Sequence, residues 1–154
     1  MNVRELKAAE LKSLLALYEH LYPVAGAAPD LDTIEAIWQE LRVSPYHKYF
    51  GAFVDGYLVS SCALTLTPNL TRGCRPYGVI ENVVTHSRYR RQGFAKAVME
   101  KALDFSWRQN CDKVMLVSSR NDEEALRFCE SSGFDLHEMH TFVAVHPSQA
   151  ALPS

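Results

Sequence analysis

Residues 90–95, Arg-Arg-Gln-Gly-Phe-Ala, form the segment of this 154-residue chain whose residue types point most clearly to chemistry. They fall between an expected strand and an expected helix, and the first backbone N–H groups of a helix have no partners within it. Nearby arginines add to the roughly +0.5 charge of the helix dipole. Gly93 and the small Ala95 allow a ligand to approach the backbone. The segment therefore indicates a pyrophosphate site, although a strand-to-helix junction can also carry a glycine and arginines without any ligand.

Two better-known phosphate-binding patterns are missing from the sequence. A P-loop requires G-x-x-x-x-G-K-[ST], and a dinucleotide-binding unit requires G-x-G-x-x-G. Neither string occurs in the chain. ATP and NAD are therefore poorer candidates for the pyrophosphate ligand.

The segment resembles the acyl-CoA motif R/Q-x-x-G-x-G/A of the GNAT superfamily of N-acetyltransferases. Arg90, Gly93 and Ala95 occupy its three fixed positions. Residues 80–85 (Ile-Glu-Asn-Val-Val-Thr) precede it as the family's fourth strand does, and residues 125–134 follow it like the family's A-x-x-F-Y-E-x-x-G-F segment. The resemblance implies an enzyme that uses acetyl-CoA as co-substrate.

The resemblance also implies where acetyl-CoA would bind. The cleft would open where two neighbouring parallel strands, Tyr77–Thr85 and Lys113–Ser118, splay apart. Main-chain groups of the first strand would bind the pantetheine arm, and the 90–95 segment would hold the pyrophosphate. Asn121 is either a further contact or simply the N-cap of the next helix. The expected cofactor-binding residues are Val83, Val84, Thr85, Arg90, Arg91, Gln92, Gly93, Phe94, Ala95 and Asn121.

Acyl transfer to an amine requires a base, because an alkyl amine has a pKa of about 10.4 and is mostly protonated at neutral pH. Glu81 is the candidate, acting directly or through a water molecule, and the resemblance supports an acidic residue there. It could instead form an ion pair with Arg75 or Arg88. Asn82 would point to the opposite face of a regular strand, so both residues serve the acceptor only if a bulge intervenes. The resemblance implies such a bulge.

Cys129 is the main departure from the family pattern, because many members carry there a tyrosine that protonates the leaving CoA thiolate. A thiol has a suitable pKa, about 8.5, but a cysteine side chain is much shorter than a phenol. A bridging water or solvent could supply the proton, and Cys129 could be a small buried apolar residue. The expected catalytic residues are Glu81, Asn82 and Cys129.

The elements that must position these residues follow from apolar spacing. Two helices come first, at about 11–22 and 30–41, and each ends before a proline. Strands at 49–54 and 57–66 flank Asp55-Gly56, a pair that favours a two-residue hairpin turn. The remaining expected elements are a strand at Tyr77–Thr85, a helix at about Arg91–Gln109, a strand at Lys113–Ser118, a helix at Asn121–Ser132 and a final strand at Phe134–Val145.

The expected fold class is α/β: a GNAT-like, mixed, mostly antiparallel twisted sheet with a splayed parallel central strand pair and helices on both faces. We expect one domain over residues 1–146 and a disordered tail over residues 147–154. The apolar face of the final strand could form a homodimer surface or pack internally.

Composition narrows the range of partners. The net charge is −2, with a pI of about 6.3, whereas nucleic-acid binding usually requires a basic excess. The four cysteines form no C-x-x-C pair, and His137 and His140 would face opposite sides of a strand, so no metal site is expected. No apolar run approaches the ~18 residues of a membrane span, and the charged N-terminus does not resemble a signal peptide. These features indicate a cytoplasmic protein without nucleic-acid or membrane partners.

The expected function is transfer of the acetyl group of acetyl-CoA to a primary amine by direct attack in a ternary complex. The acceptor would be a small-molecule amine or a peptide amine. The alternative is a non-catalytic acyl-CoA-binding regulatory or interaction module.

Overall fold

A computed structural model describes residues 1–21, 29–118, 123–135 and 141–149 of the chain. The chain divides into two compact units, Met1–Ser118 and Ser119–Ser154. Among the described residues, the first unit contains the sheet, three α-helices and three 3-10 turns. The second contains α4 (Glu123–Ser132) and a short 3-10 turn at Pro147–Gln149. The single domain expected over residues 1–146 stays a prediction.

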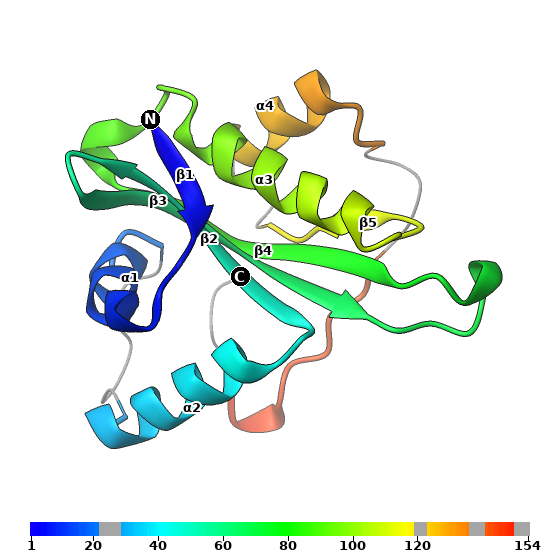
Figure 1. Cartoon of the computed structure of the whole chain (residues 1–154), viewed down its shortest axis with the longest axis horizontal. Coiled ribbons are helices and arrows are strands. Elements are labelled where there is room, and N and C mark those ends of the chain that lie inside the picture. The colour runs from blue at the N-terminus through cyan, green and yellow to red at the C-terminus, as the bar shows by residue number, and fades with distance from the viewer. Residues whose placement is uncertain (22–28, 119–122, 136–140, 150–154) are drawn as a thin grey trace. The chain divides into compact units, whose positions relative to one another are not determined.

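Five strands form one sheet in the order β1-β2-β3-β4-β5, shown in Figure 1. Neighbouring strands are antiparallel except for β4 and β5, which are parallel. The mixed, mostly antiparallel sheet with one parallel pair is therefore confirmed. In the strand order of the described residues, however, that pair lies at one end rather than at the centre. The strands are β1 (Asn2–Glu5), β2 (His47–Val54), β3 (Tyr57–Thr67), β4 (Tyr77–Thr85) and β5 (Val114–Leu116).

The β2–β3 hairpin turns at Asp55-Gly56 as predicted. Both residues have positive φ, 50° and 82°, which is the backbone of a two-residue turn matched to the twist of the strands. The adjoining residues Val54 and Tyr57 are paired. From this turn the pairing of β2 with β3 shifts register once, between Ala52 and Phe53, before Tyr49 pairs with Ala63.

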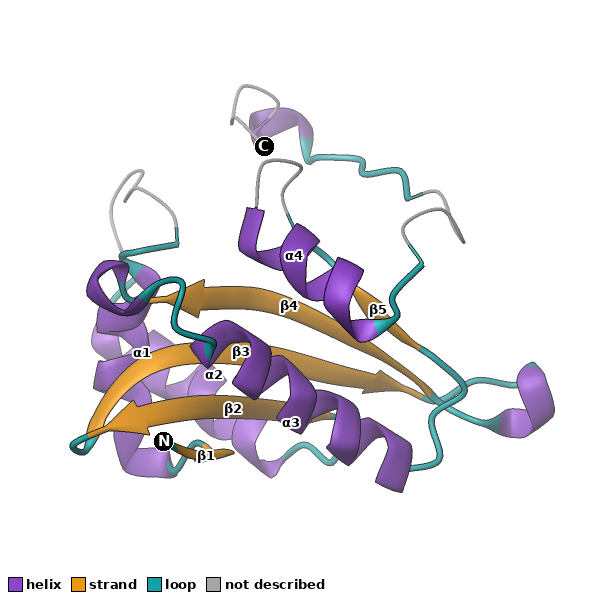
Figure 2. Cartoon of the chain, turned by 90° about the horizontal axis from the view of Figure 1, so that it is seen from above, coloured by secondary structure: helices purple, strands orange, loops and turns teal. Residues whose placement is uncertain are grey.

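Helices cover both faces of the sheet, as predicted. The helix α3 (Phe94–Arg108) contacts β2, β3 and β4. On the opposite face, α1 (Leu11–Tyr18) contacts β3 and β4, and α2 (Leu31–Val43) contacts β2. Figure 2 shows α3 in front of the strands and α1 and α2 behind them. None of the helices in the described ranges is long and apolar enough to span a bilayer.

Side chains of β2 alternate between the two helical layers. The ring of Phe50 lies 5.9 Å from that of Phe105 in α3. Its neighbour Tyr49 points the other way and lies edge-on to Trp38 of α2, with ring centroids 5.2 Å apart. Because successive strand residues face opposite sides, odd-numbered residues of β2 face α1 and α2.

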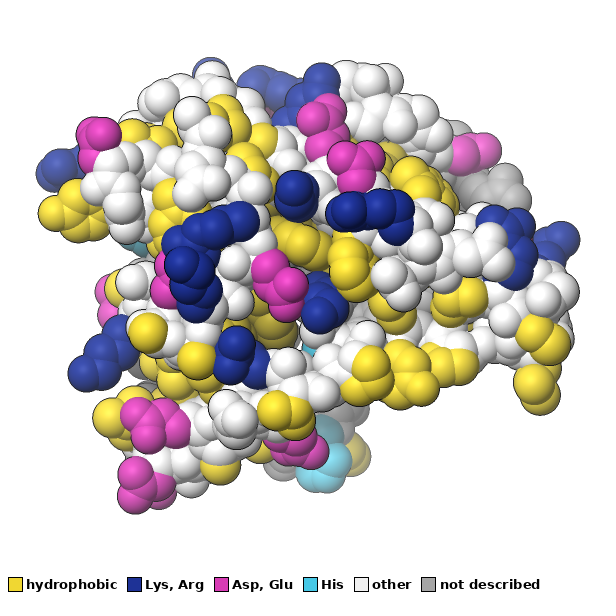
Figure 3. Space-filling model, in the orientation of Figure 1, with side chains coloured by type: hydrophobic (Ala, Val, Ile, Leu, Met, Phe, Trp, Pro, Cys, Tyr) yellow, Lys and Arg dark blue, Asp and Glu magenta, His cyan; other side chains and the backbone are white. Residues whose placement is uncertain are grey.

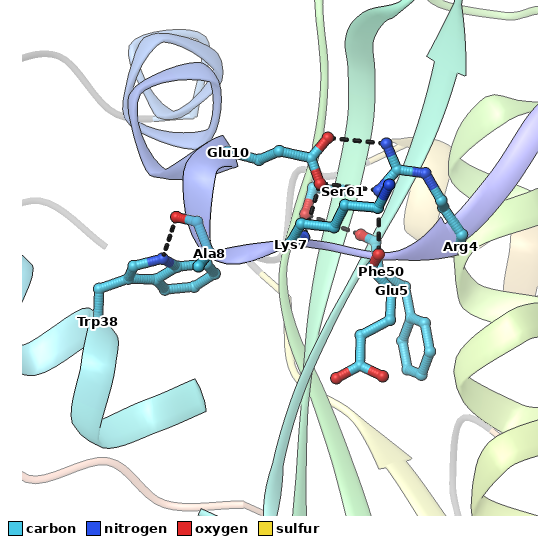
Figure 4. Close-up of polar contacts among 8 residues, drawn as sticks. All are labelled: Arg4, Glu5, Lys7, Ala8, Glu10, Trp38, Phe50 and Ser61. Carbon is cyan, nitrogen blue, oxygen red and sulfur yellow. Dashed lines mark hydrogen bonds and ion pairs between the residues drawn. The ribbon is translucent and has the colours of Figure 1, made fainter. Parts of the chain in front are cut away.

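Polar contacts, drawn in Figure 4, link the N-terminal residues 4–10 to one another and to α2. The guanidinium of Arg4 donates to both carboxylate oxygens of Glu10, at 2.7 and 2.8 Å. Glu10 also accepts from the backbone N–H of Lys7 at 2.6 Å. The indole N–H of Trp38 donates to the carbonyl oxygen of Ala8 at 3.0 Å, which ties α2 to the same segment.

Two predictions about element boundaries are wrong. The final strand expected at Phe134–Val145 is not formed by residues 141–146, which lie in no strand, and residues 136–140 are outside the described ranges. Its apolar residues Phe142 and Val143 are 92% and 81% exposed, so they lack the buried face that a strand pattern assumes. The third helix begins at Phe94 rather than Arg91, because the loop before it includes left-handed backbone.

Candidate functional site

A bulge interrupts β4 at Asn82. Ala63 of β3 pairs with Glu81 and Ser61 pairs with Val84, so β4 uses one residue more than β3 over this stretch. Asn82 has φ 53°, a left-handed conformation that suits an extra residue in one strand. The bulge lies where the sequence resemblance placed it, and it puts Glu81 and Val84 on the same face of the sheet.

Glu81 lies in a cross-strand row with Tyr49. Both residues pair with Ala63, Tyr49 from β2 and Glu81 from β4. Directly paired residues project from the same face, so Glu81 faces the α1 and α2 layer, as Tyr49 does. The methyl group of Ala63 is too small to separate the two longer side chains. The candidate base therefore lies on the face opposite α3.

Tyr18 of α1 belongs to the same neighbourhood. Tyr18 and Tyr49 are both half-buried and pack against one apolar cluster that includes Leu14 and Trp38. Burial raises the pKa of Tyr18, and the negative charges of nearby groups, Glu81 among them, raise it further. Burial also raises the pKa of Tyr49, again with a contribution from the Glu81 carboxylate. Both phenols therefore stay protonated near neutral pH and can donate hydrogen bonds.

The Glu81 carboxylate forms no ion pair with either arginine considered as its partner. Arg75 lies 3.8 Å from Asp112 and donates to the carbonyl oxygens of Asn110 and Cys111. Within the described ranges, no hydrogen bond or ion pair is found for the Glu81 side chain. The ion pair of Glu81 with Arg75 or Arg88, considered as the alternative to a catalytic role, is therefore not formed in the described parts of the chain.

One side of β4 has no strand partner beyond Ile80. The parallel pairing with β5 covers Gly78 to Ile80 and ends with a hydrogen bond from the N–H of Val117 to the carbonyl oxygen of Ile80, at 2.9 Å. Among the described residues, β4 continues through Glu81–Thr85 without a neighbour on that side. Unpaired strand edges carry N–H and C=O groups that an extended ligand can use.

The N-terminus of α3 is uncapped by side chains. Its N-cap residue, Gly93, has φ 85°, and no side chain of the described residues accepts a hydrogen bond from the first turn. A methyl group added at Gly93 would meet no protein atom within 4 Å, so the space beside this backbone is open. Arg91, two residues earlier, also has positive φ, 61°. Exposed amides beside open space are what a phosphate group requires at a helix start.

The side chain of Arg90, in the loop between β4 and α3, forms hydrogen bonds within the protein. Its guanidinium donates to the carbonyl oxygen of Thr85 at 3.3 Å and to that of His20 at 3.4 Å. Gln92 donates to the carbonyl oxygen of Arg88 at 3.3 Å. The positive charge of Arg90 remains near the helix start, but its hydrogen bonds are used within the protein. Arg91 is exposed and is better placed to meet an anion.

Two histidines meet beside this loop. The rings of His20 and His86 lie 4.2 Å apart, and His86 accepts a hydrogen bond from the N–H of Arg88 at 3.1 Å. Burial chiefly lowers the pKa of His86, and the neighbouring His20, Arg88 and Arg90 lower it further. The neutral form of His86 is therefore favoured.

The structure places the other expected site residues as follows. Thr85 is buried, and its hydroxyl lies 2.9 Å from that of Ser60. Phe94 and Ala95 are buried in the first turn of α3. Cys129 is buried in α4, which belongs to the second compact unit. The expected contacts of Asn121, and the pair His137 and His140, lie outside the described residues.

The described surface shows no arrangement for a metal ion. In those ranges, no group of three or more His, Cys, Asp or Glu side chains could hold one. Basic and acidic side chains are interspersed over the face shown in Figure 3, so neither sign dominates that view.

Comparisons with known proteins agree with this geometry. The model of the acetyltransferase (GNAT) family matches residues 11–134. A glucosamine 6-phosphate N-acetyltransferase of Trypanosoma brucei brucei is 35% identical over 141 residues, covering 90% of this chain and 91% of that protein. An aminoglycoside N(6')-acetyltransferase type 1 of Serratia marcescens is 28% identical over 127 residues, covering 80% and 84%. A solved structure from Agrobacterium tumefaciens str. C58 has a TM-score of 0.84 and 32% identity, covering 94% of this chain and all of that one.

Proposed function

Because this chain belongs to the acetyltransferase (GNAT) family, we propose that it transfers the acetyl group of acetyl-CoA to the primary amine of a small molecule, by direct attack in a ternary complex. The observation that carries the proposal is the open β4 edge at 81–85 followed at once by the uncapped start of α3. Relatives named for glucosamine 6-phosphate and for aminoglycosides support a small-molecule acceptor.

The residues around this edge fit acetyl-CoA. The main chain of Val83, Val84 and Thr85 would bind the pantetheine arm as an added strand does. The amides of residues 91–95 would hold the pyrophosphate, with Arg91 adding charge and Gly93 leaving room for it. When bound, acetyl-CoA supplies the thioester that the amine attacks. Asn121 remains a proposed contact.

Glu81 would act as the general base. Its carboxylate removes a proton from the acceptor's ammonium group, directly or through one water, and leaves the nitrogen lone pair free to attack. The new C–N bond forms as the C–S bond breaks, and the sulfur leaves as a thiolate. The bulge at Asn82 supports this role because it places the carboxylate at the point where the β4 edge becomes unpaired. The side-chain amide of Asn82 is proposed as a second contact to the acceptor.

The thiolate must then gain a proton. Cys129 would supply it through a bridging water, and solvent is the competing source, because a thiol is shorter than the phenol that many family members carry at this position. Either source balances the reaction: the ammonium nitrogen loses two protons, the first to Glu81 before the attack and the second as the amide forms. One proton reaches the sulfur, and one is released to solvent.

The proposal is tested by measuring thiol release from acetyl-CoA with a panel of primary amines, alongside calorimetric binding of acetyl-CoA to the same protein. Binding together with amine-dependent thiol release supports acetyl transfer. Binding without turnover on any amine would instead identify a non-catalytic acyl-CoA-binding module. Absence of binding would overturn both.

A further inference from the structure

The face of the sheet that carries Glu81 also carries two phenol groups, from Tyr18 and Tyr49. Adjacent strands lie about 4.8 Å apart, so two strand spacings put the backbones of Tyr49 and Glu81 at about 10 Å from each other. Their side chains project from the same face of the sheet, on either side of Ala63. Tyr18 approaches from α1, which packs over β3 and β4.

Neither phenol hydroxyl is used within the described parts of the protein. No hydrogen bond is found there for the hydroxyl of Tyr18 or of Tyr49. No fully buried side-chain oxygen or nitrogen of these parts lacks a partner. Both hydroxyls must therefore reach solvent, although their rings are half-buried. Two phenol donors and an unpaired carboxylate thus lie on one face of the sheet, and both tyrosine rings pack against an apolar cluster.

The two phenol hydroxyls and the Glu81 carboxylate together determine which ligand groups can bind. The rise in the pKa of both phenols keeps them as O–H donors throughout the range in which enzymes usually work. Donors need oxygen or nitrogen acceptors on the ligand. An anionic group between the phenols would be repelled by the Glu81 carboxylate, whereas a neutral hydroxyl oxygen would not. The ammonium group of the ligand would lie toward Glu81.

We propose that Tyr18 and Tyr49 bind hydroxyl oxygens of the acceptor, and that the acceptor is therefore an amine with hydroxyl groups near its nitrogen. This inference rests on the proposed function, because it uses Glu81 as the group that meets the amine. It adds the substrate class and two residues that select it.

The test compares two acceptors with four proteins. Glucosamine and cyclohexylamine share a six-membered ring and a primary amine, but only glucosamine carries hydroxyl groups. The proteins are the wild type, Tyr49→Phe, Tyr18→Phe and the control Tyr57→Phe, whose side chain is 73% exposed at the start of β3. The measured quantities are kcat and KM for each acceptor, and the thermal unfolding midpoint of each variant.

We expect the wild type to prefer glucosamine. Tyr49→Phe and Tyr18→Phe should each lower kcat/KM for glucosamine by about tenfold, the effect of one lost hydrogen bond, mostly through KM. Their values for cyclohexylamine and their unfolding midpoints should stay unchanged, and Tyr57→Phe should match the wild type. A loss confined to the hydroxylated acceptor cannot come from a general structural effect.

The inference would be overturned if the two tyrosine variants lost kcat/KM equally for both acceptors, or lost it for neither. It would also be overturned if the wild type had the same kcat/KM for cyclohexylamine as for glucosamine. This measurement does not depend on whether any variant folds. In those cases the proposed function stands. If the wild type binds acetyl-CoA but acetylates no amine, the proposed function is contradicted. The inference, which rests on it, is then contradicted as well.

Discussion

Tyr49 and Glu81 are paired with the same residue, Ala63, from opposite sides, and so stand in one row on one face of the sheet. Burial chiefly raises the pKa of the Tyr49 phenol, and the nearby Glu81 carboxylate raises it further. The candidate base is thus positioned by strand register rather than by a loop. The bulge at Asn82 follows at once in the chain, and Asn82 has left-handed backbone.

Replacing Glu81 by glutamine should separate catalysis from cofactor binding. The amide has nearly the same shape but cannot take a proton, so kcat should fall by about 10²-fold or more. The affinity for acetyl-CoA should not change, because the proposed cofactor contacts are main-chain groups. Stopped-flow thiol detection and calorimetry measure the two quantities. Glu100→Gln on the exposed side of α3 is the control, and a Glu81→Gln enzyme as fast as this control would remove Glu81 from the mechanism.

Gly93→Ala should weaken the binding of coenzyme A, because the added methyl enters the open space beside the α3 amides. The positive φ of 85° adds a folding cost of about 1 kcal/mol. Gly73→Ala is a matched control: its φ is 70° and its surroundings are equally open. Both variants should lose similar stability in denaturant titrations, but only Gly93→Ala should lose about tenfold in affinity, or 1.4 kcal/mol. Equal affinities in the two variants would argue against a ligand at Gly93.

Glu10→Gln should lower the free energy of unfolding by about 1 kcal/mol at pH 7. The guanidinium of Arg4 chiefly holds the pKa of Glu10 below its usual value, with help from the Lys7 amide. A carboxyl with a lowered folded-state pKa stabilises the fold above its unfolded pKa of about 4.3, and this contribution is lost as pH falls through the folded pKa. The difference between wild type and variant should therefore shrink on acidification. Urea titrations at several pH values measure it, and a difference that is constant down to pH 3 would contradict the ion-pair account.

Cys129→Ala should cost stability more than rate. The side chain is 7% exposed, so its truncation leaves a small cavity around a buried position. Removal of a required general acid typically costs about 10²-fold in rate. We expect a much smaller change in kcat, because solvent can protonate a thiolate. A fall in kcat of about 10²-fold, together with loss of the alkaline limb of the pH–rate profile, would instead identify Cys129 as the proton donor.

Most of the fold could be predicted because its elements carry strong local signals. The β2–β3 hairpin has a positive-φ pair at its turn, and α3 buries Val98, Met99 and Ala102 along one stripe. The first strand, Asn2–Glu5, was not predicted, since four residues are too few for alternation to stand out and all of them are exposed or half-buried. The strand predicted at Phe134–Val145 is wrong for the opposite reason: its alternation is clear, but its described residues, 134–135 and 141–145, lie in no strand, and 141–145 are exposed.

Some residues of the candidate site could be predicted from the sequence, and others could not. Residues near one another in sequence, such as Glu81 and Gly93, could be found from a motif. Tyr18 and Tyr49 could not, because their relation to Glu81 depends on strand register and on packing of α1 over the sheet. The apolar pattern of β2 and α1 makes both tyrosines look like ordinary core residues, and only the unused hydroxyls distinguish them.

The most direct test of the central claim is a crystal structure of the chain with coenzyme A. We expect pyrophosphate oxygens within about 3 Å of amide nitrogens in the Gln92–Ala95 turn, and the pantetheine arm along Val83–Thr85. A ligand bound elsewhere, with the α3 amides satisfied by the protein's own side chains, would contradict the account.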